Sequence, residues 1–394
     1  MNISLDVIQT LGLAVIVFIF GSVVKSKVKI LQTYYIPAPV IGGLTFSLLM
    51  FALFNFNGTT LVLDKVLQNF CMNIFFTCVG FTVSFKLIKR SGKQGIILAF
   101  IAVFFLVIQN LVGVSLATIF GIHKLLGVAM GSISMSGGVG SGAAFGPTLE
   151  MLGAEGATTI GVAAATFGLL MGSMVGGPVA KRLIDKYKLK SDFISEGFDE
   201  KEELDITVLN EKNILYSVLI VILGAAGGTV VSLILKFTGI TFPYYVGCLF
   251  GGAIARNIAD AGVYELRIKE VDILGNISLY LFLSMTLMSL NISKLVDLAI
   301  PMIVILIMQT TVMVTYAYFV TFKTMGKTYD AAVMAAGHCG VGLGQTPNAL
   351  ANMSSVIEKN GAAPNAWFVL PVITVVFINI FNPIIITFFI NFFK

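Results

Sequence analysis

A glycine-rich motif occurs twice in this sequence, at positions separated by 200 residues. The first copy runs from Ser136 to Gly142 toward Pro147, and the second runs from Gly337 to Gly344 toward Pro347. A shift of 200 residues superposes identical residues, including Gln109, Val112, Ala117, Gly137, Gly140, Gly142 and Pro147 of the first half. Glycine-broken apolar segments at matching positions of two halves are typical of the binding site of a secondary transporter, because unwound backbone at membrane depth must line a cavity or be buried in protein.

Each motif is predicted to form a re-entrant hairpin, in which one half-helix enters the membrane and a second returns from a turn near its middle. The turn brings the carbonyl end of one half-helix and the amide end of the other to the same cavity. Free amides favour an anionic group, and free carbonyls favour a small cation such as sodium. The predicted substrate-binding residues are Ser136, Gly137, Gly138, Gly140, Ser141, Gly142, His338, Gly340, Gly342, Gln345, Thr346 and Asn348.

The second turn has residue types that suit the start of a half-helix. We expect Thr346 to cap the helix and Pro347 to occupy its first position, where the missing amide costs nothing. Glycine pairs in apolar helices are otherwise commonly packing surfaces, an interpretation that suits Gly42-Gly43, Gly227-Gly228 and Gly251-Gly252. The two long motifs have four glycines within seven or eight residues, which favours a broken helix over packing alone.

Polar residues at repeat-related positions provide candidates for holding sodium or for bracing the hairpins. Gln109 and Asn110 correspond to Gln309 and Thr310, in the middle of two apolar segments, and hydrogen bonding between helices is the alternative role. The candidate sodium ligands are Ser134, Gln109, Asn110, Gln309, Thr310, Gly337 and Cys339.

Charged residues are missing from the central part of every predicted span. An anionic substrate would therefore be held by backbone dipoles, hydroxyls and amides. His338 could donate to a carboxylate or cap a turn, and both roles stay open. No acidic partner lies near His338 and Cys339 in the sequence, so an intramembrane hydrolase, which needs an oriented base beside its nucleophile, is disfavoured. No metal other than sodium and no other cofactor is expected.

The composition is that of a membrane protein, with 57% hydrophobic and 11% charged residues. The net charge of +5 is not gathered on a soluble face, so nucleic acid is not an expected partner. No Lys or Arg precedes the first apolar run, so residues 7 to 24 are expected to be a retained span. Twelve apolar segments are present, at 7–24, 34–54, 69–85, 95–120, 125–149, 157–180, 213–235, 242–255, 273–292, 299–322, 331–353 and 364–393.

The distribution of Lys and Arg predicts the topology, because these residues concentrate in short cytoplasmic loops. If the fifth and eleventh segments enter and return, 20 of the 25 Lys and Arg lie on one side. This arrangement predicts an all-α polytopic membrane protein with ten transmembrane helices and two re-entrant hairpins, near 125–153 and 328–358. Both termini are expected outside, and the hydrophilic connector 181–212, including the charged run 199–203, is expected in the cytoplasm as a solvated linker.

Each half then contains five spans and one hairpin, so the two repeats, 1–180 and 213–394, have inverted topologies. The first hairpin is expected to enter from outside and the second from the cytoplasm.

The motif residues resemble those of the sodium/glutamate symporter family. Similarity is seen in Ala335–Gly344 with Thr346-Pro347 and Ala351–Met353, and in Ser136–Gly138 with Gly140 and Gly142–Ala144. It extends to the stretches Ala165–Gly168, Gly176–Ala180, Ile36-Pro37, Pro39-Val40, Leu274–Asn276, Ser278-Leu279, Gly326-Lys327 and Tyr329–Val333. The match covers nearly the whole chain.

This resemblance implies sodium-driven uptake of L-glutamate across a prokaryotic plasma membrane, by a homodimer working through an elevator-type movement. Val139 and Asn379 depart from the family's pattern, which often has His at the first position and an acidic residue at the second. The alternative is sodium-coupled transport of another small di- or tricarboxylate such as aspartate, malate or citrate, since the sodium/2-hydroxycarboxylate transporters are more distantly similar.

Overall fold

The computed structural model describes residues 2–34, 36–90, 92–191, 210–237, 239, 242–290, 292 and 298–394. The helices of the first half are α1 (Val7–Lys27), α2 (Lys29–Thr33), α3 (Ala38–Asn57), α4 (Val66–Gly80), α5 (Phe85–Arg90), α6 (Gly92–Ile119), α7 (Lys124–Val128), the π-helix η1 (Ala129–Ile133), α8 (Gly138–Met151) and α9 (Ala157–Tyr187). Those of the second half are α10 (Glu211–Lys236), α11 (Tyr244–Asp260), α12 (Ile268–Met288), α14 (Ala299–Tyr316), the π-helix η2 (Ala317–Thr321), α15 (Phe322–Thr324), α16 (Tyr329–Leu343), α17 (Thr346–Asn360) and α18 (Pro364–Phe393).

Nine helical segments within the described residues are long and apolar enough to cross a membrane, so the chain is a multi-pass membrane protein. They coincide with nine of the ten predicted spans. The tenth, predicted at 242–255, forms α11, whose 17 residues make it shorter than the others. Within the described residues the all-α prediction has one exception, because the three-residue strands β1 (Asn2–Ser4) and β2 (Thr60–Val62) pair in parallel.

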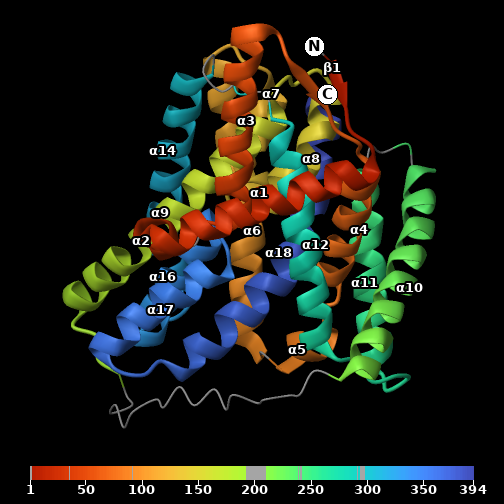
Figure 1. Cartoon of the computed structure of the whole chain (residues 1–394). Coiled ribbons are helices and arrows are strands. Elements are labelled where there is room, and N and C mark those ends of the chain that lie inside the picture. Colours follow the sequence, from red (N-terminus) through yellow and green to blue (C-terminus); the bar gives the residue numbers. More distant parts are fainter. Residues whose placement is uncertain are drawn as a thin grey trace.

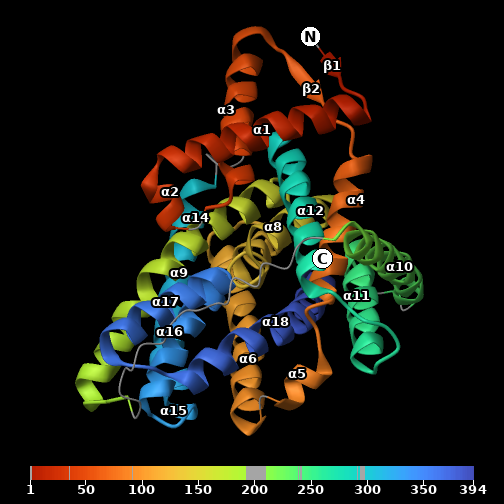
Figure 2. The same ribbon diagram turned by 60° about the horizontal axis from the view of Figure 1, so that its bottom comes forward.

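The helices form two bundles (Figures 1 and 2). The first, which we call the scaffold bundle, contains α1, α3, α4, α10, α11 and α12, which pack on one another. The second, the hairpin bundle, contains α6–α9, α14 and α16–α18. Figure 2 shows α9, α16 and α17 on one side of the molecule and α4, α10 and α11 on the opposite side. The bundles meet where α8 packs against α12.

Close helix packing accounts for five of the six glycines that were interpreted as packing residues. A methyl group on Gly42 or Gly252 would collide with the carbonyl oxygen of Val17 or Thr77, respectively. Gly43, Gly228 and Gly251 are similarly confined, whereas Gly227 has open space around it. Glycine thus allows α1 and α3, and α10 and α11, to approach at backbone contact.

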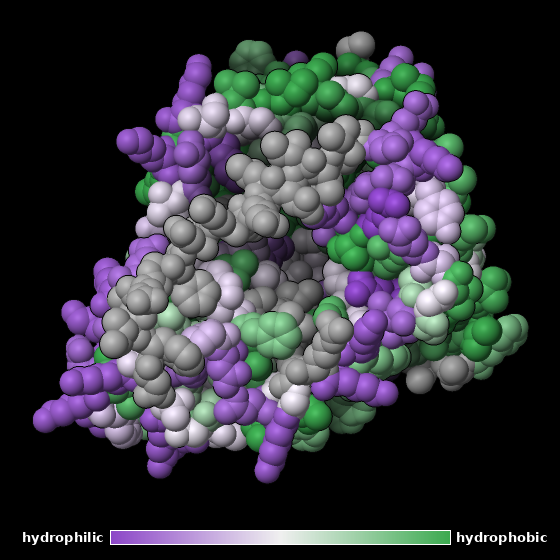
Figure 3. All heavy atoms as spheres, turned by 90° about the horizontal axis from the view of Figure 1, so that it is seen from below, coloured by the Kyte–Doolittle hydropathy of each residue, from purple (hydrophilic) through white to green (hydrophobic). Residues whose placement is uncertain are grey.

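Figure 1 shows both chain ends at one end of the molecule and α5 at the other, and Figure 2 shows α15 at the same end as α5. Figure 3 shows hydrophilic side chains around this second end and hydrophobic ones on the flanks. Helix α9 continues to Tyr187, seven residues beyond the expected end of the first repeat. Residues 192–209, which include most of the expected connector and its charged run 199–203, lie outside the described residues.

Candidate functional site

Both glycine motifs form the turns of helical hairpins. In the first hairpin α7 and η1 form the entering arm and α8 the returning arm, and the chain breaks at Gly131, whose ψ is −135°. Gly138 starts α8 with a φ of +71°, a conformation that side chains rarely adopt. In the second hairpin α16 and α17 are continuous helices of 15 residues each.

The expected capping of α17 is wrong by one residue. Gln345 is the residue before the helix, Thr346 is the first helical residue and Pro347 the second, and no side chain caps this end. Proline still costs little there, because the first amides of a helix have no intrahelical acceptor.

The two turns touch. A methyl group on Gly138 would lie 2.5 Å from Nε2 of Gln345, so the absence of a side chain lets the second turn reach the first. The sequence predicted two hairpins in matching positions, and the structure places their turns together.

A cavity of about 770 Å³ lies beside the two turns, between the bundles. Five of the predicted substrate-binding residues line it: Gly137, Gly140, Ser141, Gln345 and Asn348. Its opposite wall belongs to the scaffold bundle, with Phe75 of α4 and Asn276 of α12 among its residues. Val139 and Asn379, the two departures from the family's pattern, also line it. Ser136, Gly138, Gly142, His338, Gly340, Gly342 and Thr346 do not.

The cavity contains a cation that the sequence analysis missed. Lys25 is the one charged residue among the described residues that line it. Neither of the ion pairs recorded in the described part of the chain involves Lys25. It was counted as a loop residue, but α1 continues to Lys27 and carries Lys25 into the last turn. The spacing of Ser22, Lys25 and Ser26 is the signal that could have revealed it, because residues three and four apart share one helix face.

Backbone amides add to this positive potential. Val139, Gly140 and Ser141 belong to the first turn of α8 and line the cavity. The first amides of a helix lack intrahelical acceptors and carry the positive end of its dipole. The cavity can therefore bind an anion at two places, on α8 of the hairpin bundle and at Lys25 of the scaffold bundle.

Gln109 of α6 connects the two hairpins. Its Nε2 donates to the carbonyl oxygen of Gly342 (2.7 Å), and its Oε1 accepts from Oγ of Ser136 (2.7 Å). Gln309, its repeat-related counterpart, donates through Nε2 to the carbonyl oxygen of Gln109 (2.7 Å). The geometry thus favours the bracing role for Gln109, whereas Gln309 makes the hydrogen bond between helices that was the alternative role.

Asn110 and Ser134 hold the first turn in place. Asn110 accepts from the backbone amide of Ser132 and donates to its hydroxyl, both at 2.9 Å. The hydroxyl of Ser134 donates to the carbonyl oxygen of Gly161 of α9 (2.7 Å). Thr310 donates only to Leu306 of its own helix, at 2.9 Å.

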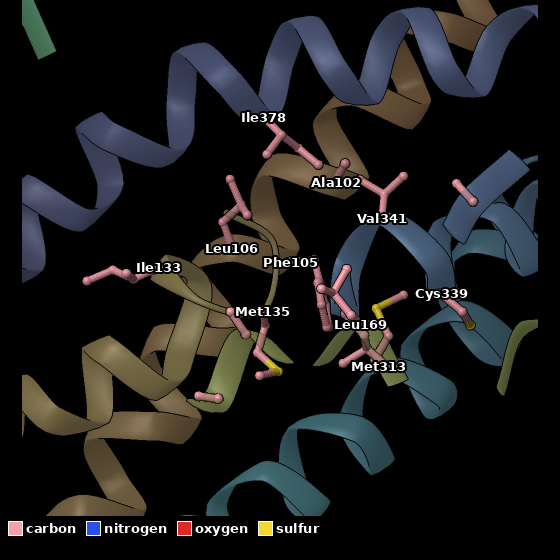
Figure 4. Packing of buried hydrophobic residues seen from close by; sticks show 14 of the residues in the cluster. Ala102, Phe105, Leu106, Ile133, Met135, Leu169, Met313, Cys339, Val341 and Ile378 are labelled. Carbon is pink, nitrogen blue, oxygen red and sulfur yellow. The ribbon is translucent and has the colours of Figure 1, made fainter. Parts of the chain in front are cut away.

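Several motif residues are packed inside the hairpin bundle. His338 is 1% exposed, and its Nδ1 lies 2.8 Å from Oγ1 of Thr321. Cys339 is fully buried, and Figure 4 shows it among apolar side chains that include Leu169 and Met313. Methyl groups on Gly142, Gly337, Gly340 or Gly342 would press against Gly161, Leu370, Ala349 or Met313, respectively. The packing interpretation therefore explains these four glycines.

Unpartnered amide oxygens mark where a sodium ion could be held. Oδ1 of Asn348 is buried without a hydrogen-bond donor, as are Oε1 of Gln309 and Oδ1 of Asn382. The amide nitrogen of Asn348 donates to the carbonyl oxygen of Leu169 (2.7 Å) and to Oγ of Ser173 (2.8 Å). Since a buried carbonyl oxygen without a donor is costly, a bound cation would stabilise it. The described residues contain no cluster of His, Cys, Asp and Glu that could hold a transition metal.

Comparison with known proteins gives the family. The model of the family described as "Sodium/glutamate symporter" matches residues 3–362. The chain belongs to the sodium/glutamate symporter family. A sodium/glutamate symporter of Haemophilus influenzae is 35% identical over 395 residues, covering 97% of this chain and 96% of the relative. One from Escherichia coli K12 is 36% identical over 392 residues, with the same coverage.

Family membership agrees with the expected transporter and with the exclusion of an enzyme. Among solved structures, a sodium proton antiporter of Methanocaldococcus jannaschii at pH 8 aligns with a TM-score of 0.43 and 16% identity. That alignment covers 98% of this chain and 96% of the antiporter, and no site assignment follows from it.

Proposed function

We propose that this protein is a secondary active transporter that couples the entry of sodium to the uptake of L-glutamate. The cavity between the two bundles carries this proposal, because both hairpin turns reach it and its single charge is positive. Its volume of about 770 Å³ is within the range of small-molecule sites, roughly 300–1,000 Å³. The symporters of Haemophilus influenzae and Escherichia coli, similar over nearly their whole length, support the choice of substrate and ion.

The carboxylates of glutamate would bind at the two positive positions of the cavity. One would lie against the amides of Val139 and Gly140 in the first turn of α8, and the other beside Lys25. Asn276 and Asn379, also in the lining, offer amide oxygens to the ammonium group. This division explains how an acidic amino acid is recognised without an arginine at membrane depth.

Sodium would bind beside the second turn. Asn348 lines the cavity and has a buried Oδ1 without a donor, and a methyl group on Gly344 would lie 3.0 Å from both its Nδ2 and the carbonyl oxygen of Gly340. This carbonyl belongs to the last turn of α16, where helix carbonyls lack intrahelical donors. A cation and an anion bound in adjacent places stabilise each other, which is the physical basis of coupling.

The order of the elements supports an inverted repeat. In each half a long helix, α6 or α14, precedes a hairpin, which is followed by a second long helix, α9 or α18. With α11 as a tenth span, the positive-inside pattern places Lys25 at the cytoplasmic end, so the cavity would open to the cytoplasm. The hairpin bundle would then move as a unit along the scaffold bundle, in a homodimer with both termini outside and the connector 181–212 in the cytoplasm.

Uptake of radiolabelled glutamate into proteoliposomes tests the function. We expect glutamate to accumulate when an inward sodium gradient is present and not to accumulate without it. Equal uptake under the two conditions would contradict the proposal. A tenfold excess of aspartate, malate or citrate should compete poorly, and strong competition by one of them would identify the alternative substrate.

Lys25→Met tests the recognition of the anion. A hydrogen bond to a charged group contributes about 1.5–3 kcal/mol, so the KM for glutamate should rise roughly ten- to a hundredfold. Lys27→Met is the control, because Lys27 lies on the same helix end and outside the cavity lining. An equal change in both variants would show that only the overall charge matters.

A further inference from the structure

A second hollow lies on the hairpin bundle, between α9 and α14 with the π-helix η2. Its volume is about 640 Å³. One wall is formed by Met174, Val175 and Pro178 of α9, and the other includes Val314 and Phe319. Met174 and Phe319 are 49% and 52% exposed, so the groove is open at the apolar flank of the molecule. We call it the α9–η2 groove.

The α9–η2 groove ends in two cations. Arg182 and Lys186 both line it, and their spacing of four residues places them on one face of α9. The ammonium of Lys186 lies 5.5 Å from the ring centres of Tyr187 and Tyr318, which hold it over the groove. Neither cation belongs to the ion pairs recorded in the described ranges.

We propose that the α9–η2 groove binds an anionic phospholipid, with its phosphate between Arg182 and Lys186 and an acyl chain along the apolar walls. Apolar walls at membrane depth are filled by lipid chains, and two unpaired cations at one end complement a phosphate there. Basic pockets between transmembrane helices on the cytoplasmic side bind the headgroups of anionic lipids. The dicarboxylate substrate does not fit this chemistry, because the apolar walls would leave its polar groups unsatisfied.

The position of the groove gives the lipid a role distinct from that of the transport cavity. Helix α9 also packs against α16 and α17 of the second hairpin. A lipid seated between α9 and η2 therefore stabilises the bundle that carries both turns without touching the cavity.

The test measures thermal unfolding of the full-length protein in detergent while phosphatidylglycerol or phosphatidylcholine is added. We expect phosphatidylglycerol to raise the unfolding temperature at lower concentration than phosphatidylcholine. Each basic residue near the membrane surface contributes about fivefold to binding, so Arg182→Gln with Lys186→Gln should weaken phosphatidylglycerol roughly thirtyfold. Met174→Trp, which fills the groove without changing charge, should weaken both lipids.

The matched control is Lys181→Gln with Lys190→Gln, which removes two charges from the same region outside the groove lining. It should retain the preference for phosphatidylglycerol. Equal losses in the two double variants would overturn the proposal, and so would a wild-type protein that does not discriminate between the lipids. Stabilisation by glycerol phosphate alone would show a headgroup site without an acyl chain. A change of oligomeric state in the groove variants would show that a second copy of the chain covers the α9–η2 groove. Either result would contradict the proposal that a phospholipid occupies this groove.

The unfolding temperature and elution of each variant without added lipid report whether it is folded. A variant with a changed baseline is replaced by the single substitution Arg182→Gln, for which about fivefold weaker binding is expected and unchanged binding contradicts the proposal.

Discussion

The two hairpins carry the same glycine motif but use it differently. In the first hairpin Gly137 and Gly140 line the cavity, and a methyl group on Gly140 would lie 3.2 Å from the ring of Phe75 in the scaffold bundle. In the second, a methyl group on Gly340 would lie 2.5 Å from the backbone of Ala349, inside the hairpin itself. One motif thus provides a wall for a ligand, and the other allows two helices to pack at backbone contact.

The two hairpins also differ in the regularity of their backbone. The entering arm of the first is interrupted by η1 and by the break at Gly131. Both arms of the second are regular, and the chain leaves helical geometry only near Gly344 and Gln345. The irregular hairpin is the one with more residues in the cavity lining, as expected if unwound backbone at membrane depth is kept where it contacts a ligand.

The largest expected difference is between Gly340→Leu and Gly140→Leu. Leucine at 340 would force the arms of the second hairpin apart, so we expect a markedly lower unfolding temperature and little folded protein. Leucine at 140 would enter the cavity, so the protein should fold normally and lose glutamate uptake. Gly227→Leu is the control, because Gly227 has nothing within 4 Å of its missing side chain.

Unfolding temperatures and uptake of the three variants separate the two effects. A stable, inactive Gly340→Leu protein would contradict the packing role and restore a ligand-contact role for both glycines.

Substitutions of the two repeat-related glutamines, Gln109 and Gln309, are expected to differ less in their effect on stability. Gln109 bonds to both hairpins, whereas Gln309 bonds only to the backbone of α6. Gln109→Leu leaves the carbonyl of Gly342 and the hydroxyl of Ser136 without their best partner, at a cost of about 1–3 kcal/mol for an unsatisfied buried group. Chemical denaturation should show this loss, together with reduced uptake.

Gln309→Leu should cost less, and Thr310→Val, which loses only a bond within its own helix, is the control for the assay. Equal losses in Gln109→Leu and Gln309→Leu would show that the hairpins do not depend on the bridge through Gln109.

The sequence predicted the position of both hairpins, but the expectation that both glycine clusters break a helix was wrong for the second, because Gly337, Gly340 and Gly342 lie inside the regular helix α16. The repeat of 200 residues placed both turns, and the apolar runs placed nine long helices that the structure confirms. It did not separate Gly140 from Gly340, because the neighbour of each glycine, Phe75 of α4 in one case and Ala349 of α17 in the other, is set by tertiary packing.

Two residues with evident chemistry, one predicted and one missed, show where the sequence analysis failed. His338 lies in the motif but its ring packs beside Phe105 and Tyr316, away from the cavity lining. Lys25, in contrast, looked like an ordinary loop charge and lies in the cavity. Whether a polar residue faces a ligand depends on tertiary packing, and only the polar spacing of Ser22, Lys25 and Ser26 hinted at it.

The smallest expected difference compares the hydroxyls at the two turns. Ser141 lines the cavity and Thr346 does not, although both were predicted to help bind the anion. A neutral hydrogen bond contributes about 1 kcal/mol, so Ser141→Ala should weaken glutamate binding roughly fivefold in sodium buffer. Thr346→Val should stay within about twofold of the unsubstituted protein, because its hydroxyl neither lines the cavity nor caps α17. Calorimetric titration of both variants measures this directly. A larger loss for Thr346→Val would mean that the second turn, and not α8, carries the hydroxyl contact with the substrate, and the contrast between the hairpins would have to be reversed.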